Sequence, residues 1–338
     1  MKILLIMDPG IPVPPTLYGG IERVVYLLAE EYIKLGHDVT LLAGPDSDCS
    51  GQTIIFGVND LNRSKAARNK EILFVWKYLY RNHQAFDVIH NFGRLIYLLP
   101  VVKSRVCKVM SYQRDISAEG IKIISALSAR NLIFTACSNY CVSTGNVAGT
   151  WKTVYNAIDF LKYQLNEHVD NNAPLIFLGR IERIKGAHTA VKVAIKTGNK
   201  LIIAGNIPPD AHDYFETEIK PFVDNIQIKY VGAVNDAEKN VFLRQSKALL
   251  FPIEWDEPFG IVMIEAMACG TPVIGFKRGA VPEVVTNETG IRINTYEEML
   301  VAVEQINGIN RKKCREIAQA RFDASTIACE YLNLIKSR

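Results

Sequence analysis

The 338-residue sequence lacks an apolar stretch long enough to cross a membrane. A spanning helix needs about 20 consecutive apolar residues, whereas apolar runs such as residues 3–7 and 201–204 fall well short. The amino terminus, Met-Lys and five apolar residues before Asp8, is too short for the core of a signal peptide. We therefore expect a cytoplasmic protein.

Two further absences exclude whole classes of site. The seven cysteines are an odd number without a C-x-x-C pair, so the sequence encodes neither a disulfide framework nor a zinc site. Cys137 and Cys141 are spaced to share a helix face, and we expect small buried side chains there. No G-x-G-x-x-G follows the first predicted strand, which removes the signal expected of a nicotinamide or flavin enzyme.

The composition is that of a folded protein, with 49% hydrophobic and 22% charged residues. The net charge of +4 is uneven, because residues 1–157 carry 17 Lys and Arg against 12 Asp and Glu. Much of this excess lies at helical spacing, in Arg63, Lys65, Arg68, Lys70, Lys77 and Arg81. Such a segment fits a membrane surface or an acidic acceptor, but the pattern favours the solvated face of a core helix. Nucleic acid is not an expected partner, because the pI of about 8.5 is mild and no recognition motif accompanies the charge.

Apolar runs of strand length alternate with helical patterns throughout, which predicts an α/β protein with two Rossmann-like domains. The first domain is residues 1–157, with strands expected at 2–8, 38–43, 87–90, 108–111, 132–136 and 152–154. The second domain is residues 158–321, with strands expected at 175–178, 200–204, 227–231, 248–251 and 272–275. The polar segment 158–174 is interpreted as the linker between them. A last helical pattern at about 322–338 is compatible with packing on either domain, including a return to the first.

Two glycine-containing loops suit an anionic ligand. Gly19 and Gly20 open a helix after a proline-rich loop, where backbone N–H groups and the helix dipole favour phosphate; a tight turn without ligand explains the pair almost equally well. In the second domain, Arg180 and Lys185 follow a strand and precede a helix. A planar guanidinium and a mobile ammonium together suit a diphosphate, although such a pair taken alone fits a solvated loop better.

The most specific segment runs from Glu257 to Ile274. Its helix is apolar almost all round, so the carboxylate of Glu265 should be buried and requires hydrogen-bond donors. A ligand's hydroxyl pair would supply them, and so would a buried Arg or the backbone. Glu257 lies in the preceding loop, where it could meet other hydroxyls. Two acids at this spacing favour the ligand.

These motifs resemble those of retaining glycosyltransferases of family four, which have the GT-B fold of two Rossmann-like domains facing across a cleft. The likeness covers essentially the whole chain. The early loop with Tyr-Gly-Gly-Ile-Glu resembles a branch that includes antibiotic and pterin glucosyltransferases. The resemblance implies a metal-independent hexosyltransferase that uses a nucleoside-diphosphate sugar, with UDP expected from family frequency. The acceptor, a small molecule or a glycan or lipid precursor, would bind the first domain.

The resemblance also implies roles for residues. Glu257 and Glu265 match the E-x7-E motif, whose acids contact the donor sugar and the nucleotide ribose, and Arg180 and Lys185 match the element that binds the diphosphate. We expect Arg180, Lys185 and Glu257 to act in catalysis. The complete set expected to bind the donor is Gly19, Gly20, His90, Gln113, Arg180, Lys185, Val231, Gly232, Val234, Glu257, Phe259, Gly260, Ile261 and Glu265.

The sequence departs from this family at one point, and two further features need interpretation. Gln113 stands where a His is usual near the donor sugar. His90 matches an earlier family His, and it is interpreted equally well as lining the cleft or as a satisfied histidine at a strand end. Asp46-Ser47-Asp48 resembles the metal-binding D-x-D of the other major glycosyltransferase fold, but in a polar loop it is interpreted as chance, so no metal is expected.

Without a metal, fixed cations must stabilise the departing diphosphate. We therefore expect Arg180, Lys185 and helix dipoles to take that charge, and the family precedent implies retention of configuration without identifying a nucleophile here. Two alternatives remain: a nucleotide-sugar epimerase of the same fold, and a non-catalytic nucleotide-sugar-binding protein. An epimerase would convert the donor without an acceptor, and a binding protein would transfer nothing.

Overall fold

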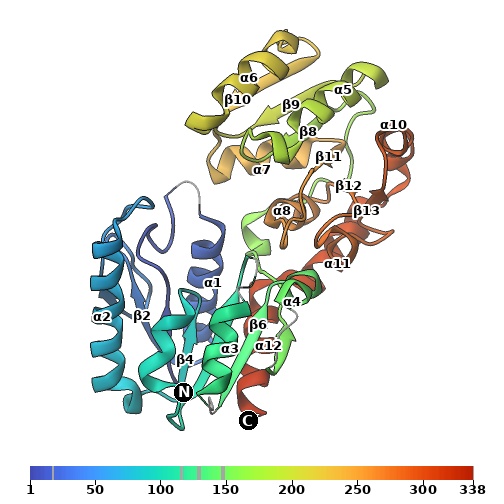
Figure 1. The fold of residues 1–338 in the computed structure, drawn as a ribbon. Coiled ribbons are helices and arrows are strands. Elements are labelled where there is room, and N and C mark those ends of the chain that lie inside the picture. The colour runs from blue at the N-terminus through green and yellow to red at the C-terminus, as the bar shows by residue number, and fades with distance from the viewer. Residues whose placement is uncertain (17–18, 115, 117, 128–130, 146–148, 338) are drawn as a thin grey trace. The chain divides into compact units, whose positions relative to one another are not determined.

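The computed structural model describes residues 1–16, 19–114, 116, 118–127, 131–145 and 149–337. Tyr18, part of the Tyr-Gly-Gly-Ile-Glu element, lies outside these ranges. The chain divides into two compact units: unit 1 comprises residues 1–157 and 324–338, and unit 2 comprises residues 158–323. Each unit contains one wholly parallel sheet flanked by helices (Figure 1). No helix in the described ranges is both long and apolar enough to cross a lipid bilayer.

Unit 1 has a seven-stranded sheet in the order β3-β2-β1-β4-β5-β6-β7. Its strands are β1 Lys2–Ile6, β2 Asp38–Ala43, β3 Gln52–Ile55, β4 Val88–Asn91, β5 Cys107–Tyr112, β6 Leu132–Ala136 and β7 Trp151–Thr153. Its helices are α1 Gly20–Lys34, α2 Lys65–Asn82, α3 Ala118–Ala126, α4 Asn139–Gly145 and α12 Ala324–Lys336. Short 3-10 helices lie at η1 His83–Ala85 and η2 Leu95–Val101. Runs such as residues 3–6 are buried on both faces, as in parallel sheets covered by helices.

Unit 2 has a six-stranded sheet in the order β10-β9-β8-β11-β12-β13. Its strands are β8 Leu175–Leu178, β9 Leu201–Ala204, β10 Ile228–Gly232, β11 Ala248–Phe251, β12 Val273–Phe276 and β13 Gly290–Ile293. Its helices are α5 Ala187–Thr197, α6 His212–Glu218, α7 Asp236–Gln245, α8 Ile261–Ala268, α9 Val281–Val284, α10 Tyr296–Gln305 and α11 Arg311–Phe322. Five short 3-10 helices are η3 Phe160–Lys162, η4 Arg183–Lys185, η5 Pro209–Ala211, η6 Lys220–Phe222 and η7 Ile306–Gly308.

Two strands and one segment differ from the sequence-based expectations. The strands β3 and β13 were not predicted, because each is a four-residue edge strand without a continuous buried apolar run. Segment 158–174 was interpreted as a linker, and this is corrected: it packs on unit 2. Phe160 in η3 is fully buried, and the Arg315 guanidinium donates to its carbonyl oxygen at 2.8 Å.

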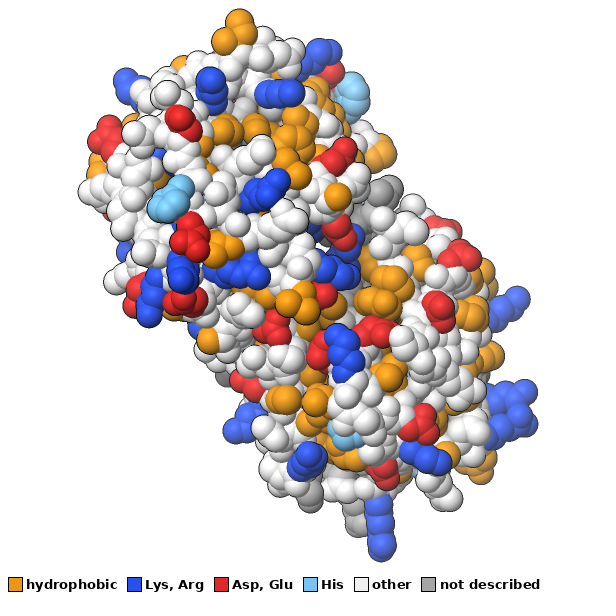
Figure 2. Space-filling model, turned by 180° about the vertical axis from the view of Figure 1, so that it is seen from behind, with side chains coloured by type: hydrophobic (Ala, Val, Ile, Leu, Met, Phe, Trp, Pro, Cys, Tyr) orange, Lys and Arg blue, Asp and Glu red, His pale blue; other side chains and the backbone are white. Residues whose placement is uncertain are grey.

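The chain returns to unit 1 at its carboxyl end, where α12 packs against α1. Tyr331 of α12 is fully buried, and its hydroxyl lies 3.2 Å from the Ser111 hydroxyl at the end of β5. Cys137 and Cys141 are also buried in unit 1, as expected. Acidic and basic side chains are interspersed over the face that Figure 2 shows.

Candidate functional site

The order of strands in unit 2 creates a switch point between β8 and β11. From β8 the chain continues to β9 and β10 on one side, and then crosses to β11, β12 and β13 on the other. In open α/β sheets, ligands bind at the carboxyl ends of the strands at such a point. The loop 179–186 follows β8, and the loop 252–260 follows β11. The two predicted motifs of unit 2 therefore leave the sheet side by side.

Lys185 and Glu257 make a direct contact at this point. The Lys185 ammonium is bonded to Oε2 of Glu257, and the Trp255 indole N–H donates to the same oxygen at 2.9 Å. The Lys185 Nζ atom also lies 4.8 Å from the centre of the Trp255 ring, a cation-π distance. The side chains of Lys185 and Glu257 are 16% and 17% exposed. A partly desolvated cation and a carboxylate thus remain open to a ligand.

Gly186 explains how the two loops approach so closely. Its φ is +76°, in the left-handed region, and a Cβ there would lie 1.9 Å from the Pro252 carbonyl oxygen. The Glu254 N–H donates to the Ile184 carbonyl oxygen at 2.8 Å, which joins the loops through their backbones. Only glycine fits this position without moving the loop that carries Glu257.

Glu265 is held inside unit 2 by two donors. It lies on α8, and its side chain is only 8% exposed. Tyr163 donates to Oε1 at 2.8 Å and Lys239 Nζ lies 2.5 Å from the same oxygen. Burial, and after it the Glu265 carboxylate, raise the pKa of Tyr163 well above its ordinary value, which keeps its hydroxyl a donor. No donor from the described residues reaches Oε2 within hydrogen-bonding distance, so this oxygen can still accept from a ligand.

Protein groups therefore satisfy part of the need for donors at Glu265, but they are a tyrosine and a lysine rather than the arginine or backbone considered from the sequence. Sequence reasoning missed both. Tyr163 lay in the segment assigned to a linker, and Lys239 lies on α7 with no motif of its own. No sequence signal could identify them, since Tyr163 is 102 residues from its partner.

The remaining predicted residues of unit 2 lie along the same edge of the sheet. The Arg180 guanidinium is 37% exposed and lies 2.9 Å from the Glu182 carboxylate. Val231, Gly232 and Val234 lie at or just after the carboxyl end of β10, and a Cβ on Gly232 would meet only open space. Gly260, with φ +82°, is the N-cap of α8, and the half-buried Ile261 is the first residue of the helix.

Phe259 differs from the other predicted residues. Its side chain is 2% exposed and its ring packs edge to face on Phe322, with centroids 5.8 Å apart. The ring therefore belongs to the core, which leaves only the backbone of Phe259 at the edge of the sheet. Among the predicted charged residues, the contact between Lys185 and Glu257 is direct, whereas Arg180 and Glu265 contact other side chains.

Unit 1 has an equivalent switch point between β1 and β4. Gly20 begins α1 there, and a Cβ on the preceding Gly19 would lie 2.6 Å from the Pro15 Cβ. His90 of β4 is fully buried, and its Nε2 is 2.7 Å from the Ser111 hydroxyl. The ring therefore lies in the core of unit 1, although its Nδ1 is buried without a hydrogen-bond partner among the described residues.

A cavity of about 190 Å³ opens at this edge of unit 1. Gln113 lines it, and its Oε1 is buried without a hydrogen-bond partner among the described residues. Arg94 and Arg114 also line it, and their guanidinium groups lie 3.5 and 3.8 Å from the Asp8 carboxylate. Burial raises the pKa of nearby Glu22 above its ordinary value, and Asp8 acts in the same direction. Sequence reasoning had identified only Gln113 of this cluster.

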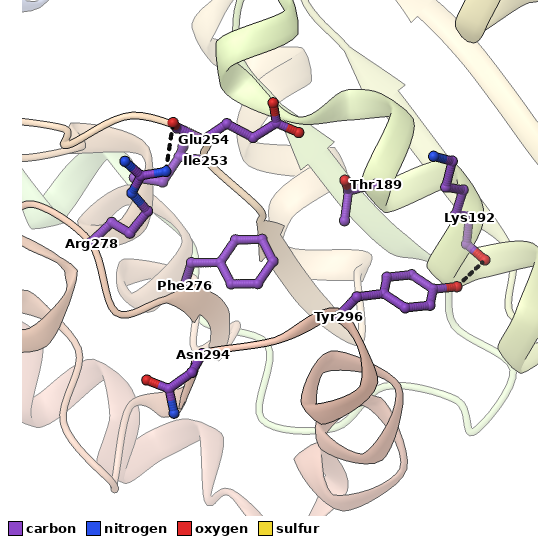
Figure 3. A pocket seen from close by; sticks show the side chains of 8 residues that line it. All are labelled: Thr189, Lys192, Ile253, Glu254, Phe276, Arg278, Asn294 and Tyr296. Carbon is purple, nitrogen blue, oxygen red and sulfur yellow. Dashed lines mark hydrogen bonds between the residues drawn. The ribbon is translucent and has the colours of Figure 1, made fainter.

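Unit 2 also contains a cavity, of about 550 Å³, and none of the predicted residues lines it (Figure 3). The Phe276 ring lies across it and the Glu254 carboxylate projects toward Thr189. That carboxylate lies 2.9 Å from Nε2 of His188, so it is paired within the protein. Among the described residues, no three His, Cys, Asp or Glu side chains are placed to share a metal ion.

Comparisons with known proteins agree with this architecture. Residues 163–321 match the family model of group 1 glycosyl transferases, and residues 18–112 match that of glycosyltransferase family 4. An uncharacterised 41.2 kDa protein from the cps region of Klebsiella pneumoniae is 28% identical, over 97% of this chain and 99% of its own length. An uncharacterised glycosyltransferase of Methanocaldococcus jannaschii is 23% identical, over 81% of each chain.

Solved structures share the fold at low identity. Sucrose-phosphate synthase from Thermosynechococcus elongatus superposes with a TM-score of 0.80 at 20% identity, over 99% of this chain and 98% of that one. HepE of Anabaena in complex with UDP gives a TM-score of 0.78 at 19% identity, with both chains fully covered. The two parallel α/β units are thus those of the GT-B fold, as predicted.

Proposed function

Because this chain is a glycosyltransferase with the GT-B fold, we propose that it moves a hexose from a nucleoside-diphosphate sugar, with UDP as the nucleotide, to an acceptor hydroxyl. The contact between Lys185 and Glu257 at the switch point carries the proposal. It joins a cation suited to a diphosphate and a carboxylate suited to sugar hydroxyls. HepE, which has the same fold and was solved with UDP and with UDP-glucose, supports this donor class.

The reaction breaks the bond between the anomeric carbon and the diphosphate oxygen, which leaves negative charge on the departing nucleotide. Lys185 and Arg180 stabilise that charge together with the amino terminus of α5, so no metal is required. When the donor binds, the diphosphate replaces Glu257 as the partner of Lys185. The freed Glu257 carboxylate then accepts hydrogen bonds from the sugar.

Two further elements complete the proposal. The Oε2 atom of Glu265 accepts from the ribose hydroxyls, while Tyr163 and Lys239 hold Oε1 and fix the carboxylate. The acceptor hydroxyl attacks the anomeric carbon from the face that the diphosphate leaves and gives its proton to the departing diphosphate oxygen, so the anomeric configuration is retained. The acceptor binds unit 1, and Gln113 keeps its expected role toward the donor: its orphaned Oε1, in the cavity of unit 1, accepts a hydrogen bond from a hydroxyl of the donor sugar.

The test compares three variants by calorimetric titration with UDP. Lys185→Ala removes a charged hydrogen-bond donor, so affinity should fall by about 10- to 100-fold. Lys196→Ala removes an exposed cation from the far end of α5, the helix that follows Lys185, and should change nothing. Glu257→Gln frees Lys185 from its internal partner, so it should bind UDP at least as tightly as the wild type while losing sugar transfer.

Three results would contradict the proposal. Wild-type UDP affinity in Lys185→Ala would remove the leaving-group assignment, and loss of transfer with EDTA would refute metal independence. If no nucleotide sugar raises the melting temperature, the donor class is wrong, because a ligand at 100 times its Kd stabilises a fold by about 2.7 kcal/mol. Release of UDP in proportion to glycoside distinguishes transfer from epimerisation, which needs no acceptor.

A further inference from the structure

Helix α2 of unit 1 has an unusual distribution of charge. Five cations on it are solvent-exposed: Lys65, Lys70, Lys77, Arg68 and Arg81. The only acid on α2, all of which the structure describes, is Glu71, and its side chain is 2% exposed. The Arg63 guanidinium, 2.8 Å away, neutralises it inside the unit. The exposed charges on α2 are therefore all positive.

Large apolar side chains lie among these cations. Leu73 is 60% exposed and Tyr80 is 76% exposed, although α2 buries Val75 and Leu79 completely on its other side. Residues 73, 77 and 80 are spaced by four and three, so Leu73, Lys77 and Tyr80 share one face of the helix. Nearby, the backbone of Ile96, itself 42% exposed, accepts a hydrogen bond from the Trp76 indole. The unit thus exposes apolar and cationic groups together.

We propose that this face of α2, formed by Lys70, Leu73, Lys77, Tyr80 and Arg81, docks on an anionic lipid surface. Lys and Arg attract lipid phosphates while their stems lie along apolar surface. Tyrosine favours the boundary between headgroups and acyl chains, and leucine inserts beside it. A helix of 18 residues forms a convex ridge of roughly 27 Å, which suits a broad planar partner.

The balance of forces on this face also predicts how binding behaves. Leu73 and Tyr80 project most from it, and Phe74, which is 42% exposed, also stacks on Phe56. Hydrophobic insertion alone is therefore weak, and attraction between charges must supply most of the affinity. Each Lys or Arg near an anionic surface contributes about five-fold to the partition coefficient. Binding should therefore need anionic lipid and should weaken strongly with salt. In Figure 2, Lys and Arg side chains project along the edge of unit 1 that carries α2.

The test is flotation of the full chain with phosphatidylcholine vesicles, with and without phosphatidylserine. The triple variant Lys70→Gln, Lys77→Gln and Arg81→Gln should bind anionic vesicles about 100-fold more weakly than the wild type. The matched control, Lys196→Gln, Lys200→Gln and Lys229→Gln, removes the same charge from exposed positions of unit 2 and should bind normally. Leu73→Ser with Tyr80→Ser should also weaken binding.

Several outcomes would overturn the inference. One is equal binding of the wild type to neutral and anionic vesicles, and another is the absence of binding to either. Equal losses in the two triple variants would assign the effect to net charge rather than to α2. Binding to soluble heparin without binding to vesicles would assign the face to an acidic polymer. The readout does not involve sugar transfer, so this inference and the proposed function fail separately.

Discussion

Replacing Gly186 with alanine should damage unit 2 in two ways that can be separated. The backbone there has φ +76°, where an L-residue costs roughly 1–2 kcal/mol. The new Cβ would also lie 1.9 Å from the Pro252 carbonyl oxygen. Carbon and oxygen in contact normally stay roughly 3.3 Å apart, so the backbone must move by more than about 1 Å. Such overpacking adds roughly 1–3 kcal/mol.

Gly198 provides a matched control at the other end of α5. Its φ is +67°, and a Cβ there would meet no heavy atom within 4 Å. Gly198→Ala should therefore lose only the backbone contribution, whereas Gly186→Ala should lose roughly 2–5 kcal/mol in total. Urea unfolding of both variants measures this difference directly.

Gly186→Ala should also weaken UDP binding, because the displaced loop carries Glu257 and its contact with Lys185. Calorimetric titration with UDP tests this, and Gly198→Ala should keep wild-type affinity. The reasoning about the close approach of the two loops would be refuted if both variants lost equal stability. Unchanged UDP affinity in Gly186→Ala would show that the contact does not depend on this approach.

Two other changes test groups beyond this contact. Burial lowers the pKa of His90 to about 3, so below pH 6.5 the unfolded chain takes up a proton that the native state refuses, and stability falls as the pH drops. At pH 5.5 this lowers the free energy of unfolding by about 1 kcal/mol. In urea unfolding, the stability advantage of the wild type over His90→Gln should therefore be smaller at pH 5.5 than at pH 7.5 by that amount. A stability difference between the two proteins that does not change with pH would contradict this. Asn235 caps α7 by accepting from the N–H groups of residues 237 and 238, and Asn235→Ala should cost about 1 kcal/mol. Asn235→Ala should also weaken nucleotide binding, because Lys239 lies on the helix that Asn235 caps. As a control, Thr295→Ala removes the cap of α10 and should lower stability alone. Equal nucleotide affinities in the two variants would count against a role for Lys239.

The sequence by itself determined the fold class, because its evidence is local. Strands buried on both faces must be continuous apolar runs, and the segments 132–136, 175–178 and 248–251 were predicted with the bounds that the structure has. The loops after β8 and β11 were also identifiable, since glycines and charges directly after a strand point to a ligand site. The edge strand β3 escaped because half-exposed, partly polar strands carry no such run.

Only the tertiary structure decided which side chains meet. Tyr163 reaches Glu265 across 102 residues, and Tyr331 reaches Ser111 across 220. His90 carries the same sequence pattern whether its ring is buried or lines a cavity, and packing against unit 1 decided that it is buried. The spacing of apolar residues along a segment indicates which of its faces is buried, because that spacing involves only near neighbours in the chain. Partners of buried polar groups come from distant segments, and only the packed fold brings them within bonding distance.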